Sequence, residues 1–274
     1  LARSVFQNGR NSHESNGSLL SLHELAVRDE RRDAGELFRQ FEDFYMTTTY
    51  ANEVINLAIA HPDGGRYAGS SRRQRSEAVR RTLQTMVSYI QVVARLEASV
   101  KLCGNATVTA AGTNSTSQGK IDEAVALFVG SIEGPFSGGA VNNSGQMMFS
   151  LAKEMCPSFG TCESHGDASV NEALEFAFSD MKEAIDDEEC NFAASVLKDR
   201  ILSILPIPLV QGALYFAAQN DGSQPLSTAP GLAAGNALTE TLLPQISEVN
   251  ETSAAFIFEN MDFDFDQAAV RDGK

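Results

Sequence analysis

Three side chains that could bind a metal ion stand close together in the sequence. His61, Asp63 and Tyr67 follow an apolar stretch with helical spacing. Carboxylate and phenolate oxygens suit a hard cation, and imidazole is a tolerable addition. These residues therefore predict a metal site on a loop after a helix. Structural roles are an alternative, because an Asp before Gly-Gly often belongs to a turn and His61 could end its helix against the dipole.

A weak internal repeat adds a fourth candidate ligand, Glu133. The stretch from Glu53 to Asp63 resembles the stretch from Glu123 to Glu133, and each ends in an acidic residue followed by Gly. Duplicated helical hairpins often face each other across a cleft, so we expect Asp63 and Glu133 to approach one site. Two neighbouring carboxylates repel each other, and a cation between them relieves that repulsion.

Arginines follow the first of these loops. Arg72, Arg73 and Arg75 could hold a small anion beside the metal, although solvated helix faces are the ordinary role of such residues. The formal net charge of -15 argues against a nucleic-acid partner. Nucleotide-loop, zinc-protease and serine-hydrolase motifs are missing, so we do not expect an enzyme.

The elements that must position these residues are helices. Helix-spaced apolar residues occur in long blocks and strand alternation appears only near 261–266, which predicts an all-α helical bundle. The repeat suggests two weakly related helical halves, residues 1–104 and 120–274, which we expect to form one compact unit around a Ser/Thr/Gly-rich linker at 105–119. The helical blocks are expected at 37–58, 72–102, 120–132, 145–155, 168–186, 190–219 and 231–259.

One segment is apolar enough to resemble a membrane span. The stretch from Ile201 to Gln219 carries no charge, but it contains Pro206, Pro208 and Gln211 and is barely long enough to cross a bilayer. We therefore expect a buried central helix with a proline kink near its start, and no membrane span.

The cysteines indicate an oxidising compartment. Cys103, Cys156, Cys162 and Cys190 are an even set flanking loops, as disulfides in secreted proteins require. Three pairings are possible. We favour Cys156 with Cys162, which closes a short loop, and then Cys103 with Cys190. Four reduced, buried cysteines in a cytosolic protein are the alternative.

Glycosylation signals agree with that compartment. Asn-X-Ser/Thr acceptors occur mostly in stretches expected to be loops or termini, where a glycan needs no burial. The chain begins with Leu1 rather than Met, and we expect that any targeting peptide has been removed. The acceptors begin at Asn16, Asn105, Asn114, Asn142 and Asn250.

Three segments resemble a known family. They are Ile121-Asp-Glu-Ala-Val-Ala-Leu-Phe-Val-Gly-Ser-Ile-Glu-Gly134, Met155-Cys-Pro-Ser-Phe-Gly-Thr-Cys162 and Ile207-Pro-Leu-Val-Gln-Gly-Ala-Leu-Tyr215. They are similar to the low-iron-inducible periplasmic proteins of algae, also called iron-assimilating proteins, which are related to the phytotransferrins. The resemblance covers residues 120–262 and reaches the first half only through the repeat.

The resemblance implies a secreted or cell-surface protein that binds ferric iron for uptake, with a small synergistic anion. It also implies contact with cell-surface or cell-wall proteins. The candidate iron ligands are then His61, Asp63, Glu133 and Tyr67, with Arg72, Arg73 and Arg75 for the anion. The alternative is a structural or adhesive extracellular glycoprotein of the same fold without a metal site. A hydrolase of the imelysin type is a third possibility, but its Gly-x-His-x-x-Glu signature is not found.

Overall fold

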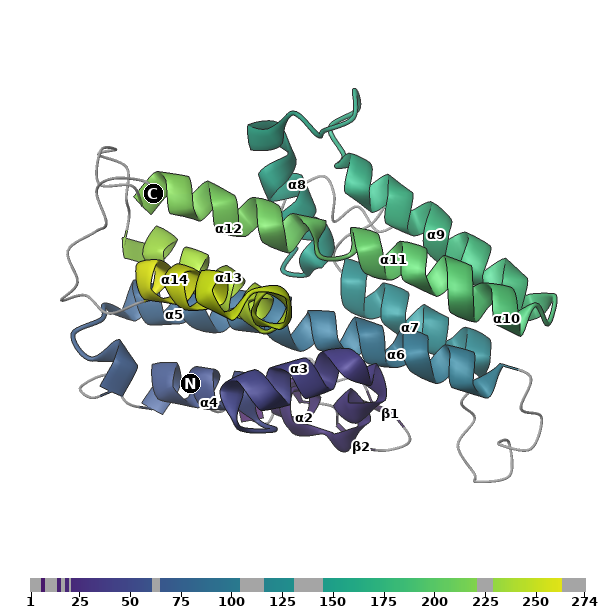
Figure 1. Ribbon diagram of the computed structural model, residues 1–274, viewed down its shortest axis with the longest axis horizontal. Helices are drawn as coiled ribbons and strands as arrows, with labels where there is room; N and C mark the ends of the chain where they lie inside the picture. The colour runs from purple at the N-terminus through teal and green to yellow at the C-terminus, as the bar shows by residue number, and fades with distance from the viewer. Residues whose placement is uncertain are drawn as a thin grey trace. The chain divides into compact units, whose positions relative to one another are not determined.

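The described part of the protein is predominantly helical, which confirms the prediction of an all-α bundle. In the computed structural model (Figure 1), the described residues are 6–7, 14–15, 18–19, 21–60, 65–103, 116–130, 145–220 and 229–262. The strands among them are a minimal antiparallel hairpin, in which β1 (Glu14–Ser15) pairs with β2 (Ser18–Leu19).

The described helices fall into two compact units. Unit 1 contains residues 1–29, 39–87 and 212–274, and unit 2 contains residues 30–38 and 88–211. These units differ from the halves expected at 1–104 and 120–274, because each is assembled from separate stretches of the chain. Most of the expected linker, 105–119, lies outside the described residues.

Unit 1 gathers helices from both ends of the chain. Its main contacts join α5 to α13, α13 to α14 and α4 to α5. An aromatic group of Phe41, Tyr45 and Tyr50 lies where α3 leads into α4. Its helices are α2 (Leu22–Val27), most of α3 (Glu36–Tyr45), α4 (Tyr50–Ala60), the 3-10 turn η2 (Gly65–Tyr67), α5 (Arg72–Thr82), the π-helix η3 (Leu83–Val87), the end of α12 (Ile207–Asn220), α13 (Ala229–Val249) and α14 (Glu251–Met261).

Unit 2 is built mainly on the pairing of α6 with α7. Phe128 packs with Phe149 and Phe178 in its core, with ring centroids 6.1 Å apart in both pairs. Its helices are the 3-10 turn η1 (Asp29–Ala34), α6 (Ser88–Leu102), α7 (Ser117–Val129), α8 (Met148–Phe159), α9 (Ser169–Asp186), α10 (Cys190–Phe192), the π-helix η6 (Ala193–Leu197), α11 (Lys198–Ile204) and the start of α12.

The helix boundaries follow local chemistry that the apolar periodicity does not report. The expected block 37–58 breaks after α3, where Met46 has a positive φ of 55°. The expected block 231–259 breaks at Asn250, whose side chain accepts a hydrogen bond from the Ser253 amide and caps α14.

The apolar segment from Cys190 to Gln219 corrects one expectation. Among the described residues it is long and apolar enough to cross a membrane, but a core helix passes the same test. We expected it to be buried, yet only 28% of its most apolar window is buried. It also breaks between Ile204 and Ile207, close to Pro206, as the prolines predicted. Length and composition alone do not assign a membrane span.

Both favoured disulfides are present. Cys103, at the end of α6, pairs with Cys190 at the start of α10, with Cα atoms 5.6 Å apart. Cys156 of α8 pairs with Cys162 three residues after that helix ends, with Cα atoms 4.9 Å apart. No free cysteine remains among the described residues. The two bonds are typical of an oxidising compartment.

Candidate metal centre

A group of buried charged residues in unit 1 surrounds Glu240. This residue lies in the middle of α13, and its side chain is only 2% exposed. The Arg66 guanidinium, carried by the short turn η2, forms an ion pair with it through Nη1. Because a buried carboxylate without a partner is costly, this ion pair is what makes the position of Glu240 tolerable.

Two further acceptors meet the same guanidinium. Arg66 Nη2 donates to Asn236 Oδ1 at 3.0 Å and to Asp262 Oδ1 at 3.1 Å. Asn236 lies one turn before Glu240 on α13, and its Nδ2 donates to the Met261 carbonyl at the end of α14. Two carboxylates thus face one guanidinium, so when both are ionised the group carries one excess negative charge.

Two tyrosines complete the surroundings. Tyr67 follows Arg66 on η2 and is 1% exposed, and Tyr45, at the end of α3, donates to the Glu240 carbonyl oxygen at 2.6 Å. Burial raises the pKa of the Tyr67 phenol; the Arg66 charge opposes this, while Glu240 and Asp262 add to it. Burial also raises the pKa of Tyr45, and Glu240 reinforces that shift. Both phenols are therefore protonated at neutral pH.

The charged residues shift each other in opposite directions. Burial raises the pKa of Glu240, and the Arg66 charge offsets part of that rise. Burial would lower the pKa of Arg66, but Glu240, Tyr67 and Asp262 outweigh it and keep the pKa of Arg66 above its usual value. Arg66 therefore stays charged, and Glu240 is the group at this centre whose charge is the more easily lost.

The centre is incompletely satisfied. No hydrogen-bond donor in the described part of the chain reaches Glu240 Oε2, and no acceptor there reaches Arg66 Nε, although both atoms are buried. A buried carboxylate oxygen can accept hydrogen bonds or bind a cation. Its unmet capacity is the feature of this centre that points to a ligand.

The predicted ligands are described only in part. Tyr67 lies at the centre, whereas His61, Asp63 and Glu133 fall outside the described residues. Within the described ranges, no three His, Cys, Asp or Glu side chains are grouped as a metal site. A metal at Glu240 and Asp262 would therefore need phenolate or other oxygen ligands besides these carboxylates.

The predicted anion-binding arginines do not share one environment. Arg72 and Arg73 are exposed in the first turn of α5, whose start is capped by Ser71 and Gln74. Arg75 is partly buried, and no acceptor in the described part of the chain reaches its buried Nε and Nη1 atoms. Among the three, Arg75 is thus the best placed to hold a small anion.

The glycosylation sites are also described only in part. Asn16, Asn105, Asn114 and Asn142 lie outside the described residues, whereas Asn250 is exposed at the start of α14. Its side-chain oxygen caps the helix, which leaves the amide nitrogen, the atom that carries a glycan, free of that role.

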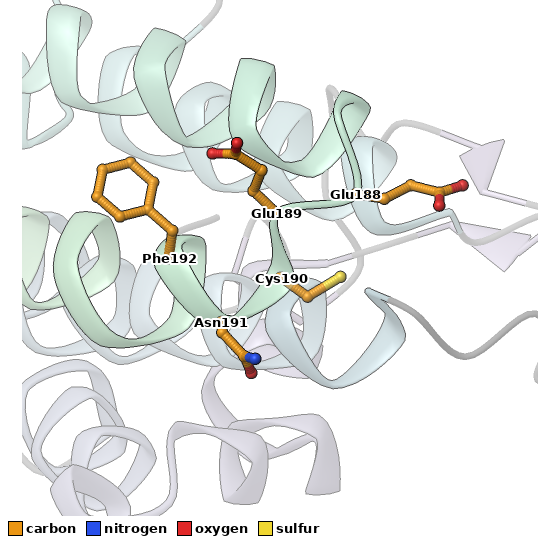
Figure 2. Close-up of a pocket in the computed structure, with 5 residues that line it drawn as sticks. All are labelled: Glu188, Glu189, Cys190, Asn191 and Phe192. Atoms are coloured by element: carbon orange, nitrogen blue, oxygen red, sulfur yellow. The ribbon is translucent and has the colours of Figure 1, made fainter.

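An open hollow in unit 2 is a weaker candidate. It is lined by five consecutive residues at the start of α10, where Cys190 forms its disulfide. Figure 2 shows the carboxylates of Glu188 and Glu189 directed away from each other, so they do not converge on a common ligand. The hollow is wide open and offers little that would hold a small molecule.

Sequence reasoning missed Glu240, Arg66, Asp262 and Asn236. One signal could have revealed Glu240, because it is the only acidic residue between Asp221 and Glu248. No family model matches this chain, and neither a curated protein nor a solved structure is significantly similar to it.

Proposed function

We propose that this protein binds ferric iron outside the cytoplasm, as cargo for uptake, and that Glu240, Asp262 and Tyr67 supply oxygen ligands. One observation carries the proposal: the buried Glu240 carboxylate has an oxygen that no donor in the described part of the chain reaches. The neighbouring Asp262 gives the centre a second carboxylate. A cation would neutralise the excess negative charge.

The donor types favour iron(III) over other common cations. Calcium prefers six to eight carboxylate, carbonyl and water oxygens, and zinc prefers nitrogen and sulfur, whereas a hard trivalent cation suits carboxylate with phenolate. The pKa of Tyr67 is raised, mainly by burial, so the phenol loses its proton only to a strongly polarising cation. Ferric iron is such a cation.

The other candidate residues and partners remain predictions under this proposal. His61 and Asp63 lie five and three residues before Arg66 in the sequence and remain predicted ligands, as does Glu133. Arg75 is the proposed anion-binding residue. The two disulfides support a location in an oxidising compartment, such as a periplasm or cell surface. Cell-surface proteins are the proposed partners.

Ferric titration of the purified, oxidised protein tests the proposal. Ferric citrate should produce a tyrosinate-to-iron charge-transfer band in the wild type. Tyr67→Phe should remove that band or weaken it strongly, and Glu240→Gln should lower the apparent affinity at least about tenfold. Tyr89→Phe is the matched control, because Tyr89 is also a buried tyrosine but lies on α6 in unit 2.

The outcomes separate the two function classes. A band in the wild type that disappears with Tyr67→Phe but persists with Tyr89→Phe supports iron binding at Glu240. Wild-type protein that stays colourless with excess ferric citrate would contradict the proposal and favour an extracellular structural or adhesive glycoprotein.

A further inference from the structure

A cation that bridges Glu240 and Asp262 would meet the Arg66 guanidinium, whose Nη1 pairs with Glu240 Oε1 and whose Nη2 pairs with Asp262 Oδ1. This guanidinium is the centre of a polar group whose acceptors come from two positions on α13 and from the residue after α14. A metal ion bound to the same carboxylates would meet this positive charge at short range. Like charges at that distance repel strongly in a buried site.

The two partners of the ion pair differ in their access to water. Glu240 is fixed in the middle of a long helix and its side chain is almost fully buried, whereas the Arg66 side chain is 22% exposed and belongs to a short 3-10 turn. A long arginine side chain can keep its stem in place while its charged head moves into water. If one partner leaves the pair, it is therefore Arg66.

We infer that Arg66 holds the position between Glu240 and Asp262 while no metal is bound, and that a metal ion that bridges the two carboxylates must displace it. This inference rests on the proposed function. Arg66 then sets a threshold for metal binding. A cation can replace the guanidinium only if it binds the carboxylates with a more favourable free energy than the guanidinium does. A trivalent cation passes that threshold more easily than a divalent one of similar size.

The displacement has a measurable signature in metal affinity. Removing Arg66 removes the competitor, so Arg66→Gln should bind ferric ion from its citrate complex about tenfold more tightly than the wild type, which equals about 1.4 kcal/mol. The same variant should lose selectivity. Manganese(II), which cannot displace Arg66 in the wild type, should bind measurably to Arg66→Gln.

Three further variants make the test specific. Arg66→Gln combined with Glu240→Gln should lose the gain, because the gain depends on the carboxylate that the arginine had covered. Arg95→Gln is the matched control: Arg95 is a buried arginine paired with two carboxylates, Glu30 and Glu123, in unit 2. It should leave both metal affinities unchanged. Helical circular dichroism confirms that each variant is folded.

A destabilised Arg66→Gln would not end the test. Arg66→Lys keeps the charge but lacks the planar fork that reaches Glu240, Asp262 and Asn236 together. A metal ion should displace this lysine more easily than it displaces Arg66. The gain in ferric affinity over the wild type should then be about threefold, smaller than the gain in Arg66→Gln. Ferric affinity equal to the wild type in Arg66→Lys would overturn the inference.

The result separates this inference from the proposed function. If the wild type binds ferric ion and Glu240→Gln weakens binding, the metal centre stands whatever Arg66 does. Ferric binding that is unchanged or weaker in Arg66→Gln would then overturn the displacement role alone, and would make Arg66 a residue that supports the bound metal or its anion. If neither the wild type nor any variant binds ferric ion, both proposals fail.

Discussion

Breaking the Cys103–Cys190 disulfide should cost about twice as much stability as breaking Cys156–Cys162. The first bond joins residues 87 positions apart and the second joins residues 6 positions apart. The entropy lost by closing loops of these lengths in the unfolded chain corresponds to about 4.6 kcal/mol for the first bond and about 2.4 kcal/mol for the second. Both bonds lie within unit 2, so they act on the same compact unit.

Reduction isolates each bond without changing the packing. A Cys156→Ala/Cys162→Ala variant keeps only the long-range bond, and a Cys103→Ala/Cys190→Ala variant keeps only the short one. Each is unfolded in urea before and after treatment with a phosphine reductant, with helical circular dichroism as the signal. The fall in the free energy of unfolding on reduction then belongs to the remaining bond.

The comparison can refute the reasoning. If reducing Cys156–Cys162 costs as much as reducing Cys103–Cys190, loop length does not control the contribution, and native-state contacts around the short loop must dominate it. As a control, the slope of the free energy of unfolding against urea concentration should be the same before and after reduction. A change in that slope would mean that the denatured state had changed as well.

Three further changes test local features. Burial alone would raise the pKa of Glu77, but hydrogen bonds and positive charge from Arg80 and Arg81 lower it below its usual value. Glu77→Gln should therefore cost about 1 kcal/mol at neutral pH, and its difference from the wild type should vanish as the pH falls through the lowered pKa, as urea unfolding across pH would show. Gly130→Ala should destabilise more than Gly160→Ala in thermal unfolding. Both glycines have positive φ, but an added Cβ at Gly130 lies 2.6 Å from Met147 and at Gly160 meets nothing within 4 Å. Asn250→Ala should cost about 1 kcal/mol and remove any glycan there, whereas Asn250→Asp should remove the glycan by mass spectrometry and keep the cap.

The sequence was sufficient for the fold class, because helical spacing of apolar residues is a local pattern. Apolar side chains at helical spacing predicted α4 (Tyr50–Ala60) and α7 (Ser117–Val129), the two helices of the proposed repeat. The cysteines left three pairings possible; the short loop favoured Cys156 with Cys162, which left Cys103 with Cys190, and both bonds are present. The same spacing could not predict that Met46 would break one block or that Asn250 would cap a new helix, since these are properties of single residues.

The candidate centre depends on long-range contacts that no local pattern contains. Arg66 and Asp262 are 196 positions apart, and Arg66 and Asn236 are 170 apart. The repeat directed attention to one pair across the two expected halves, Asp63 and Glu133, whereas unit 1 packs α5 against α13 from the other end of the chain. Tyr67 was predicted as a ligand, but its neighbours could be identified only after the helices were placed.

Replacing the ion pair at the centre separates a binding role from a structural one. Arg66→Met alone leaves Glu240 buried without its partner and should cost about 3–5 kcal/mol of unfolding free energy. Glu240→Leu alone should cost less, because Arg66 is partly exposed and keeps Asp262.

The double variant, Arg66→Met with Glu240→Leu, removes both charges and should unfold with a free energy close to or above that of the wild type, because apolar pairs often replace buried ion pairs without loss. Ferric titration of this stable variant should give no charge-transfer band. A double variant as unstable as Arg66→Met would mean that the polar network holds α13, α14 and η2 together. A stable variant that still binds ferric ion would show that Glu240 is not a ligand. A buried charge pair that stability does not need, and whose loss abolishes binding, is explained by the cation it receives.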